Sequence, residues 1–204
     1  MTETLRKKEF FDAVAPRWIT DQEQRTLRLE EIFQRAEIPF AAPLLDVGGG
    51  VGILLPLLRE RSAGPIVEYE ISREMITRAR DAHEQRGGIV FVQGDAHCLP
   101  FPDNHFGTVH CFSVYPHFTR PAQALAEIHR CLRPGGTLCI LHLMGHRELN
   151  AMHRQAGECV SRDVLPLISR LAGSLRPMGF DVLHAEERCD LYLLVARKLD
   201  LALD

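Results

Sequence analysis

The stretch Leu44-Leu-Asp-Val-Gly-Gly-Gly-Val-Gly-Ile53 joins a short apolar run to a glycine-rich loop. The run from Pro43 to Val47 predicts a buried strand, and Val51 to Arg61 after the loop predicts a helix with Pro56 in its first turns. A strand, a glycine loop and a helix in this order are typical of an open parallel α/β sheet. In such sheets ligands bind outside the carboxyl ends of the strands, where helix N-termini point free N–H groups.

The rest of the chain continues this alternation of strands and helices. Further strands are expected at 65–69, 88–92, 106–113, 137–143, 180–187 and 191–198, and helices at 2–14, 21–36, 72–84, 121–132, 146–157 and 163–177. Ser72 is the expected N-cap of its helix, and Arg133-Pro-Gly-Gly136 the turn that closes helix 121–132. Since a short turn joins the last two strands, they should pair antiparallel. We therefore predict one domain over residues 1–204, an α/β sheet of seven mostly parallel strands with a C-terminal antiparallel hairpin and helices on both faces.

The composition excludes several classes of protein. With 24 Lys plus Arg against 27 Asp plus Glu, the 204-residue chain has a net charge of −3 and no general basic field for nucleic acid or anionic lipid. No window approaches the roughly 18 apolar residues of a membrane span, and residues 1–9 lack the apolar core of a secretory signal. Six scattered cysteines without a C-x-x-C pair favour free thiols and a cytoplasmic protein. The only lysines are Lys7, Lys8 and Lys198, which we interpret as compositional bias.

Two acidic residues follow the glycine loop at the ends of the next two strands. Glu70 ends the second strand, and Asp95 follows the third. Both should face one crevice, where one carboxylate can accept hydrogen bonds from two ribose hydroxyls and the other from an exocyclic amine. The dinucleotide fingerprint would need a third glycine where the chain has Ile53, which disfavours a nicotinamide oxidoreductase. The pattern favours a nucleoside without a phosphate chain. The alternatives are a ligand-free glycine turn and a turn or capping role for Asp95.

Five motifs in order carry a resemblance to a known family. Leu44–Gly52, Glu70-Ile-Ser72, Gly94-Asp-Ala96, Leu99-Pro-Phe-Pro102 and Arg133-Pro-Gly-Gly136 resemble the class I S-adenosylmethionine-dependent methyltransferases, with the nearest likeness to the ubiquinone and menaquinone biosynthesis C-methyltransferases. The segment from Phe11 to Trp18 is similar to the N-terminal segment of that group. The resemblance implies a Rossmann-like fold, S-adenosylmethionine as the cofactor, and methyl transfer to a small-molecule acceptor.

The resemblance also implies where the cofactor is held. N-terminal helices within residues 1–40 would lie over it, and a helical segment at 144–177 would form the substrate side. The implied ligands are Asp46, Gly48 and Gly50 at the methionine end, Glu70 at the ribose, Asp95 and Ala96 at the adenine, Ser113 and Val114 beneath the cofactor, and Trp18 covering it, with Ile71 as a further cofactor residue.

Histidines gather after the fourth and fifth predicted strands. Methyl transfer requires an aligned acceptor and exclusion of water, and a general base helps where the acceptor is an oxygen, a nitrogen or an acidic carbon. The catalytic candidates are Tyr115 and His117 after the fourth strand, and His142 and His146 after the fifth. The alternative for the first two is packing beneath the next helix. His110 lies within an apolar strand and is expected to be buried with a satisfied ring nitrogen.

The helix after the fifth strand leaves a second function open. His146, Asn150 and His153 fall on one face of that helix, and Cys159 lies just beyond it. They are surface polar residues, the edge of a substrate pocket, or ligands of a metal or cofactor with His142; we assign no metal. The alternative function is thus a non-methylating S-adenosylmethionine-binding sensor or subunit that uses this helix.

The expected partners are restricted in kind. After the fourth strand the chain reads Ser113-Val-Tyr-Pro-His117, whereas many nucleic-acid and glutamine N-methylating relatives carry Asn/Asp-Pro-Pro-Tyr/Phe there. No appended nucleic-acid-binding module is visible. We expect a monomer or homodimer that acts on a small-molecule substrate, without a nucleic-acid or membrane partner.

Overall fold

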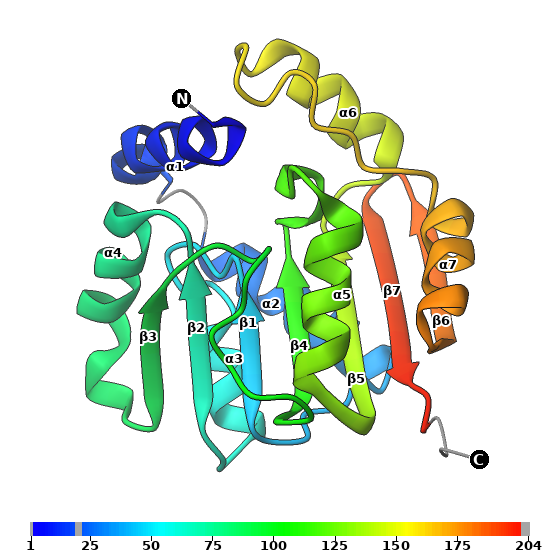
Figure 1. The fold of residues 1–204 in the computed structure, drawn as a ribbon. Helices are drawn as coiled ribbons and strands as arrows, with labels where there is room; N and C mark the ends of the chain where they lie inside the picture. Colours follow the sequence, from blue (N-terminus) through cyan, green and yellow to red (C-terminus); the bar gives the residue numbers. More distant parts are fainter. Residues whose placement is uncertain (1, 19–21, 201–204) are drawn as a thin grey trace.

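One sheet of seven strands, in the order β3-β2-β1-β4-β5-β7-β6, organises the computed structural model (Figure 1). The structure describes residues 2–18 and 22–200. Strands β1 to β5 run parallel to one another, and β7 is antiparallel to both β5 and β6, which confirms the predicted sheet and its closing hairpin. The strands are β1 (Leu44–Val47), β2 (Ile66–Glu70), β3 (Ile89–Gln93), β4 (Phe106–Phe112), β5 (Leu132–His142), β6 (Phe180–Arg188) and β7 (Leu191–Lys198).

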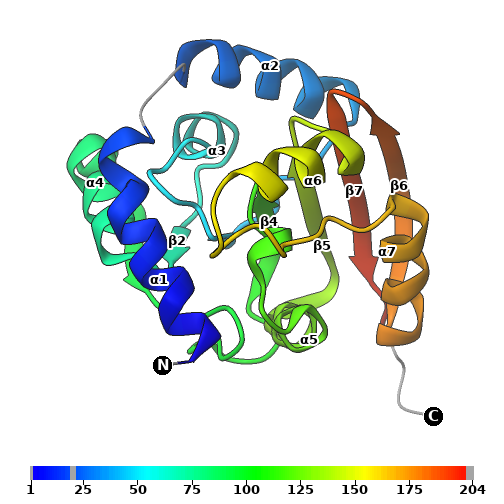
Figure 2. The same ribbon diagram turned by 90° about the horizontal axis from the view of Figure 1, so that it is seen from above.

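Helices cover both faces and the upper edge of the sheet. Side chains of α2 and α3 pack in one core cluster, those of α5 and α7 in a second, and those of α1 and α4 in a third. Helices α1 and α6 lie above the carboxyl ends of the strands (Figures 1 and 2). The α-helices are α1 (Glu3–Val14), α2 (Gln22–Arg35), α3 (Leu55–Arg61), α4 (Arg73–His83), α5 (Pro121–Cys131), α6 (His146–Gln155) and α7 (Ile168–Leu175), and the 3₁₀ turns are η1 (Ala15–Arg17), η2 (Glu84–Arg86), η3 (Tyr115–His117) and η4 (Arg176–Met178).

Local sequence determines where helix α4 begins and which side it buries. The Ser72 hydroxyl accepts a hydrogen bond from the backbone N–H of Met75 at 3.1 Å, so Ser72 is the predicted N-cap. Met75, Ile76 and Ala79 are buried at helical spacing. The Ser72 cap therefore fixes the junction between β2 and α4, and Glu70 at the end of β2 lies beside the glycine loop.

Two predicted helices are shorter than expected. The helix after the glycine loop starts at Leu55 rather than Val51, because Gly52 has φ +82°, outside the helical range, and Pro56 suits only a first turn. The last helix starts at Ile168 rather than residue 163, since a residue that precedes proline, here Leu165, disfavours helical geometry.

The segment predicted to close helix α5 is part of strand β5 instead. Helix α5 ends at Cys131, and Arg133-Pro-Gly-Gly136 continues the chain within β5. Phe106 pairs with Leu132 while Thr108 pairs with Thr137, so the register shifts across these residues. A β-bulge absorbs residues that the neighbouring strand does not match.

The helical segment predicted at 144–177 divides into two parts. Helix α6 lies above the strand ends (Figure 2), whereas α7 buries Ile168, Leu171 and Leu175 in the core on one face of the sheet. Residues 156–167 connect the two without regular helix or strand. Within the described ranges, no helix is both long enough and apolar enough to cross a membrane.

Candidate functional site

A cavity of about 790 Å³ lies at the carboxyl ends of β1, β2, β4 and β5. Helix α1, the glycine loop, the start of α2 and helix α6 supply its walls. This volume is in the range of small-molecule sites, about 300–1,000 Å³. Of the predicted cofactor residues, nine line it: Trp18, Gly48, Gly50, Glu70, Ile71, Asp95, Ala96, Ser113 and Val114.

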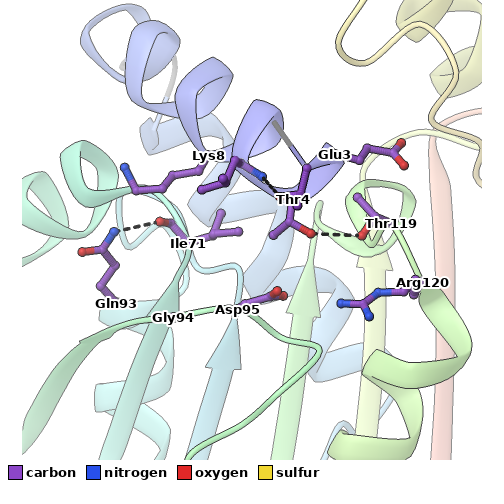
Figure 3. A pocket seen from close by; sticks show the side chains of 11 residues that line it. Glu3, Thr4, Lys8, Ile71, Gln93, Gly94, Asp95, Thr119 and Arg120 are labelled. Atoms are coloured by element: carbon purple, nitrogen blue, oxygen red, sulfur yellow. Dashed lines mark hydrogen bonds between the residues drawn. The ribbon is translucent and has the colours of Figure 1, made fainter.

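A second hollow of about 670 Å³ adjoins the cavity at the start of α1 (Figure 3). Thr4, Ile71, Gly94, Asp95 and Thr119 line both spaces. The hydroxyl oxygens of Thr4 and Thr119 lie 3.4 Å apart, so the first turn of α1 bridges to the chain that follows η3. Helix α1 is thus a roof over the Asp95 side of the cavity.

Glu70 anchors the glycine loop to helix α4. Its two carboxylate oxygens accept hydrogen bonds from the backbone N–H groups of Gly50 at 3.0 Å and Ser72 at 2.8 Å. Burial raises the pKa of Glu70, and the backbone N–H bonds oppose that rise. A carboxylate has about four acceptor positions, so Glu70, which lines the cavity, keeps acceptor capacity beyond these backbone bonds.

Behind the loop, Asp46 and Glu68 form a buried carboxyl pair on neighbouring strands. Both are 0% exposed, and no other described residue donates a hydrogen bond to the four carboxyl oxygens of the pair. Burial raises the pKa of Asp46 to about 7, and burial together with Asp46 raises the pKa of Glu68 well above its usual value. The pair therefore shares a proton, because two adjacent buried carboxylates repel each other. Asp46 itself does not line the cavity.

Two glycines of the loop have no space for a Cβ atom, because side chains of the protein pack directly against them. A Cβ at Gly49 would lie 2.1 Å from an oxygen of Glu68, and a Cβ at Gly48 would lie 2.2 Å from the side chain of Val114. Glycine at 49 therefore makes room for Glu68. Sequence reasoning missed Glu68, although a carboxylate inside the apolar run Ile66-Val-Glu-Tyr-Glu70 was a signal.

Asp95 is a turn residue as well as a cavity residue. Its side chain accepts a hydrogen bond from the backbone N–H of His97 at 3.0 Å and also contacts the His97 ring. The Tyr69 hydroxyl donates to the Asp95 carbonyl at 3.2 Å. The turn interpretation is thus confirmed, and the same bonds hold Asp95 at the edge of both hollows.

Two of the four catalytic candidates, His117 and His142, line the cavity. The His117 Nδ1 atom lies 2.6 Å from the Asp163 Oδ2 atom, which also lies 2.5 Å from the Lys7 ammonium. His142 is 2% exposed, and its Nε2 has no partner among the described residues. Burial, with lesser contributions from nearby His117 and His153, lowers the pKa of His142 to about 3. His142 is therefore neutral.

The other two candidates lie outside the cavity wall. Tyr115 packs in the core with its ring 5.9 Å from that of Phe118, and burial raises the pKa of its hydroxyl to about 12. The His146 ring and backbone N–H both bind Glu187 on β6. For Tyr115 the packing alternative holds, and His146 is a structural contact of α6.

Two of the three residues on the predicted helix face, Asn150 and His153, turn toward residues 156–167. Asn150 exchanges hydrogen bonds with the backbone of Leu165, and His153 Nδ1 lies 2.9 Å from the Asp163 carbonyl oxygen. Cys159 bonds elsewhere, to the Arg6 carbonyl. Within residues 2–18 and 22–200 no three such side chains gather as metal ligands, so the proposed set with His146 and His153 does not form.

One buried histidine differs from expectation. His110 is 1% exposed, but neither ring nitrogen has a hydrogen-bond partner in the described part of the chain. Its ring lies 5.6 Å from Phe33 and 5.8 Å from Phe40, and burial lowers its pKa to about 3. The prediction of a satisfied nitrogen was wrong, because the apolar surroundings from α2 and residue 40 offer no acceptor or donor.

Sequence reasoning also missed the polar group of Lys7 and Asp163 beside His117. Lys7 is 3% exposed and Asp163 8%. The available signal was that the chain has only three lysines and that one of them, Lys7, lies in the predicted N-terminal helix. A lysine that is buried there needs a partner of opposite charge.

The cavity as a whole fits S-adenosylmethionine. Glu70 keeps acceptor capacity toward it, Gly50 leaves room for a ligand held by the backbone, and an apolar wall adjoins both.

Comparisons with known proteins agree with this geometry. Residues 45–140 match a family model described as a methyltransferase domain. The ubiquinone/menaquinone biosynthesis C-methyltransferase UbiE of Methylococcus capsulatus is 30% identical over 175 residues, which cover 80% of this chain and 69% of the relative. The same-named protein of Hahella chejuensis is 31% identical over 172 residues, covering 79% and 68%.

A solved structure shares the whole fold. The crystal structure of the [4+2]-cyclase SpnF has a TM-score of 0.77 at 21% identity, with 98% of this chain and 97% of that chain covered. At such identity the likeness concerns the fold, and one fold hosts several chemistries. The family follows from the sequence relatives and the matched domain: this chain belongs to the class I methyltransferases, enzymes that use S-adenosylmethionine to methylate an acceptor.

Proposed function

We propose that the chain transfers a methyl group from S-adenosylmethionine to a largely apolar small molecule, with His117 as the general base. The observation that carries this proposal is that His117 lines the cavity while its Nδ1 atom lies 2.6 Å from a carboxylate oxygen of buried Asp163. Around it the wall is mainly apolar, with Phe10, Phe11, Phe112, Leu149, Met152 and Val160. An aromatic acceptor that carries a hydroxyl group suits such a wall.

The cofactor half of the cavity has the groups that a nucleoside and an amino acid need. We assign Glu70 to the ribose hydroxyls, because its carboxylate is already oriented by Gly50 and Ser72. The remaining cofactor contacts are proposed as the sequence implied them. They are Gly48 and Gly50 at the methionine end, with Asp46 behind the loop, Asp95 and Ala96 at the adenine, Ser113 and Val114 beneath the cofactor, Ile71 as a further cofactor contact, and Trp18 as cover.

The chain contributes orientation, water exclusion and a base. When bound, S-adenosylmethionine supplies an electrophilic methyl carbon, and the electron pair of the broken C–S bond returns to sulfur. His117 Nε2 takes the acceptor's proton as the acceptor's electron pair forms the new bond to carbon, and later releases that proton to solvent. We also propose that His142, kept neutral by burial, hydrogen-bonds the acceptor, because it lines the cavity and its Nε2 has no partner among the described residues. Helices α1 and α6 exclude water from above.

The curated relatives, by their names, methylate carbon in ubiquinone and menaquinone biosynthesis. We propose that the acceptor atom here is either the hydroxyl oxygen of an aromatic ring or a carbon of that ring. Loss of the hydroxyl proton makes both atoms more nucleophilic. We also propose a cytoplasmic monomer or homodimer; the six free thiols support a reducing compartment.

Binding and turnover test this function separately. Isothermal titration with S-adenosylhomocysteine should give micromolar binding, weakened about tenfold, or 1.4 kcal/mol, in Asp95→Ala. Asp181→Ala, which alters an exposed ion pair on β6, is the matched control and should bind as wild type does. Formation of S-adenosylhomocysteine from S-adenosylmethionine with a panel of hydroxylated aromatic acceptors then tests turnover. Folded wild-type protein that does not bind S-adenosylhomocysteine would contradict the cofactor assignment.

A further inference from the structure

A buried ion pair joins helix α1 to the segment between α6 and α7. The Lys7 ammonium lies 2.5 Å from both carboxylate oxygens of Asp163 and 2.5 Å from the carbonyl oxygen of Cys159. The lysine and aspartate side chains are 4% and 8% exposed. A buried charge is costly unless it is paired and hydrogen-bonded. The ion pair therefore fixes the position of α1 relative to the segment between α6 and α7.

The same carboxylate holds the catalytic candidate His117. The distance from His117 Nδ1 to the Asp163 oxygen is 2.6 Å. A carboxylate accepts hydrogen bonds, so the neutral ring places its proton on Nδ1 and leaves the lone pair on Nε2. On the other side of the segment, His153 Nδ1 lies 2.9 Å from the Asp163 carbonyl oxygen. Asp163 is thereby fixed between α1, η3 and α6.

The charges of this cluster balance only when Lys7 is present. Lys7 carries one positive charge, Asp163 one negative charge, and neutral His117 none. If Lys7 were absent, the buried carboxylate would face only imidazoles and would favour a protonated ring as its counter-ion. A histidine that already carries both protons cannot accept another, so the lysine preserves the basic form.

We propose that Asp163 is a positioning residue that holds His117 with its Nε2 lone pair available to the cavity, and that Lys7 is the counter-ion that keeps His117 neutral. This inference rests on the proposed role of His117 as base. Because α1 carries Lys7, the arrangement is complete only when α1 lies over the cavity.

The groups around His117 shift its pKa in different directions. Burial lowers the pKa of His117 most, the hydrogen bond and charge of Asp163 raise it, and His153 and Lys7 lower it. His142 is a further neutral imidazole nearby. Removal of Asp163 and removal of Lys7 should therefore move the pKa of His117 in opposite directions. Because a merely structural cluster would shift this pKa in the same directions, the pH profile of methyl transfer is the readout that separates positioning of the base from a structural role.

The test is histidine side-chain NMR on the whole protein labelled with ¹⁵N-histidine, with S-adenosylhomocysteine bound. His117→Asn identifies the His117 signals. The wild type should show the proton on Nδ1 of His117. Lys7→Met should raise the pKa of His117 by about 1 or more, and Asp163→Asn should lower it and release the tautomer preference. Lys8→Met is the matched control, because Lys8 pairs with Asp12 on the same helix and should leave His117 unchanged.

The outcomes separate this inference from the proposed function. A wild-type proton on Nε2, or the same His117 titration in Lys7→Met as in Lys8→Met, overturns the inference even where methyl transfer occurs. If Asp163→Asn does not fold, the wild-type tautomer and Lys7→Met still decide. Conversely, the expected NMR pattern in a protein that methylates none of the acceptors would leave the positioning intact and count against the proposed function. With an active acceptor, the pH profile of Lys7→Met should shift to alkaline pH.

Discussion

The cavity has two halves that are built in different ways: the proposed cofactor half, at the glycine loop and Glu70, and the proposed acceptor half, around His117. In the cofactor half, the central contact joins Gly50 to Glu70, residues 20 apart in sequence, through backbone N–H groups at strand ends. In the acceptor half, Lys7 and Asp163 are 156 residues apart and meet only because α1 and the segment after α6 lie over the same edge. A local motif therefore encodes the first half, whereas the second depends on the assembled fold.

The largest effect should come from replacing His117. Asn at 117 can still donate a hydrogen bond toward Asp163 but offers no base, so His117→Asn should reduce the rate of S-adenosylhomocysteine formation by about 10²–10⁴-fold. Binding of S-adenosylhomocysteine, measured by calorimetry, should remain within about twofold, because the cofactor half is untouched. A parallel loss of binding would show that the two halves do not act separately.

A second change tests how tightly the cofactor half is packed. In Gly49→Ala the new Cβ would lie 2.1 Å from a Glu68 oxygen, well inside van der Waals contact. Overpacking of this kind costs about 1–3 kcal/mol, which should appear as a lower midpoint in urea unfolding and as weaker S-adenosylhomocysteine binding.

The matching rescue is Glu68→Gly in the Gly49→Ala background. Since Glu68 is what fills the space, the double variant should regain most of the lost stability, a positive coupling in the double-mutant cycle. Additive losses would mean that Gly49 is required for its backbone conformation rather than for Glu68.

The buried carboxyl pair predicts a pH-dependent stability. The pKa of Asp46 is about 7 in the folded protein, above the value of about 3.9 of an unfolded aspartate. The folded state thus holds the proton more tightly, and the stability it has below about pH 4 is lost as the pH rises through about 7.

Glu68→Gln should remove part of this loss, because the amide can donate a hydrogen bond to an ionised Asp46. The expected gain at pH 8 is on the order of 1–2 kcal/mol, or roughly 2–8 °C in Tm, with a smaller difference at pH 5. Glu158→Gln, at an exposed position, is the control for loss of a charge. Equal gains at both pH values would contradict a shared proton.

The sequence predicted most of the cofactor half because its signals are local. Strand, glycine loop and helix follow one another, and Ser72 caps α4 within one turn. The errors within that half have local causes as well, such as the positive φ of Gly52 that delays α3. Glu68 escaped notice because a buried carboxylate is intelligible only beside Asp46 and Gly49.

The acceptor half was predictable only in part. His117 and His142 follow strand ends, and that position identified them. Nothing near Asp163 indicates a partner at Lys7, since helical periodicity placed residue 163 in a helix that in fact begins at Ile168. The few lysines were interpreted as compositional bias, yet Lys7 is buried in an ion pair.

The smallest effect is expected at His146, the candidate that the fold removes from the cavity. Its ring and backbone N–H bind Glu187, and the other oxygen of Glu187 accepts from the backbone N–H of Ile168 at 3.0 Å. One carboxylate on β6 thus caps the first turns of both α6 and α7. His146→Gln keeps the backbone bond, so stability should change by about 0.5 kcal/mol and turnover by less than about twofold.

Glu187→Ala, which uncaps both helices, should cost more stability, about 1–2 kcal/mol in urea unfolding, while S-adenosylhomocysteine binding stays unchanged. If His146→Gln instead reduced turnover a hundredfold with cofactor binding intact, the acceptor half would have to include the His146–Glu187 contact. The boundary between chemistry and scaffold would then lie beyond the cavity wall, because Glu187 and His146 would be acting on the acceptor through α6.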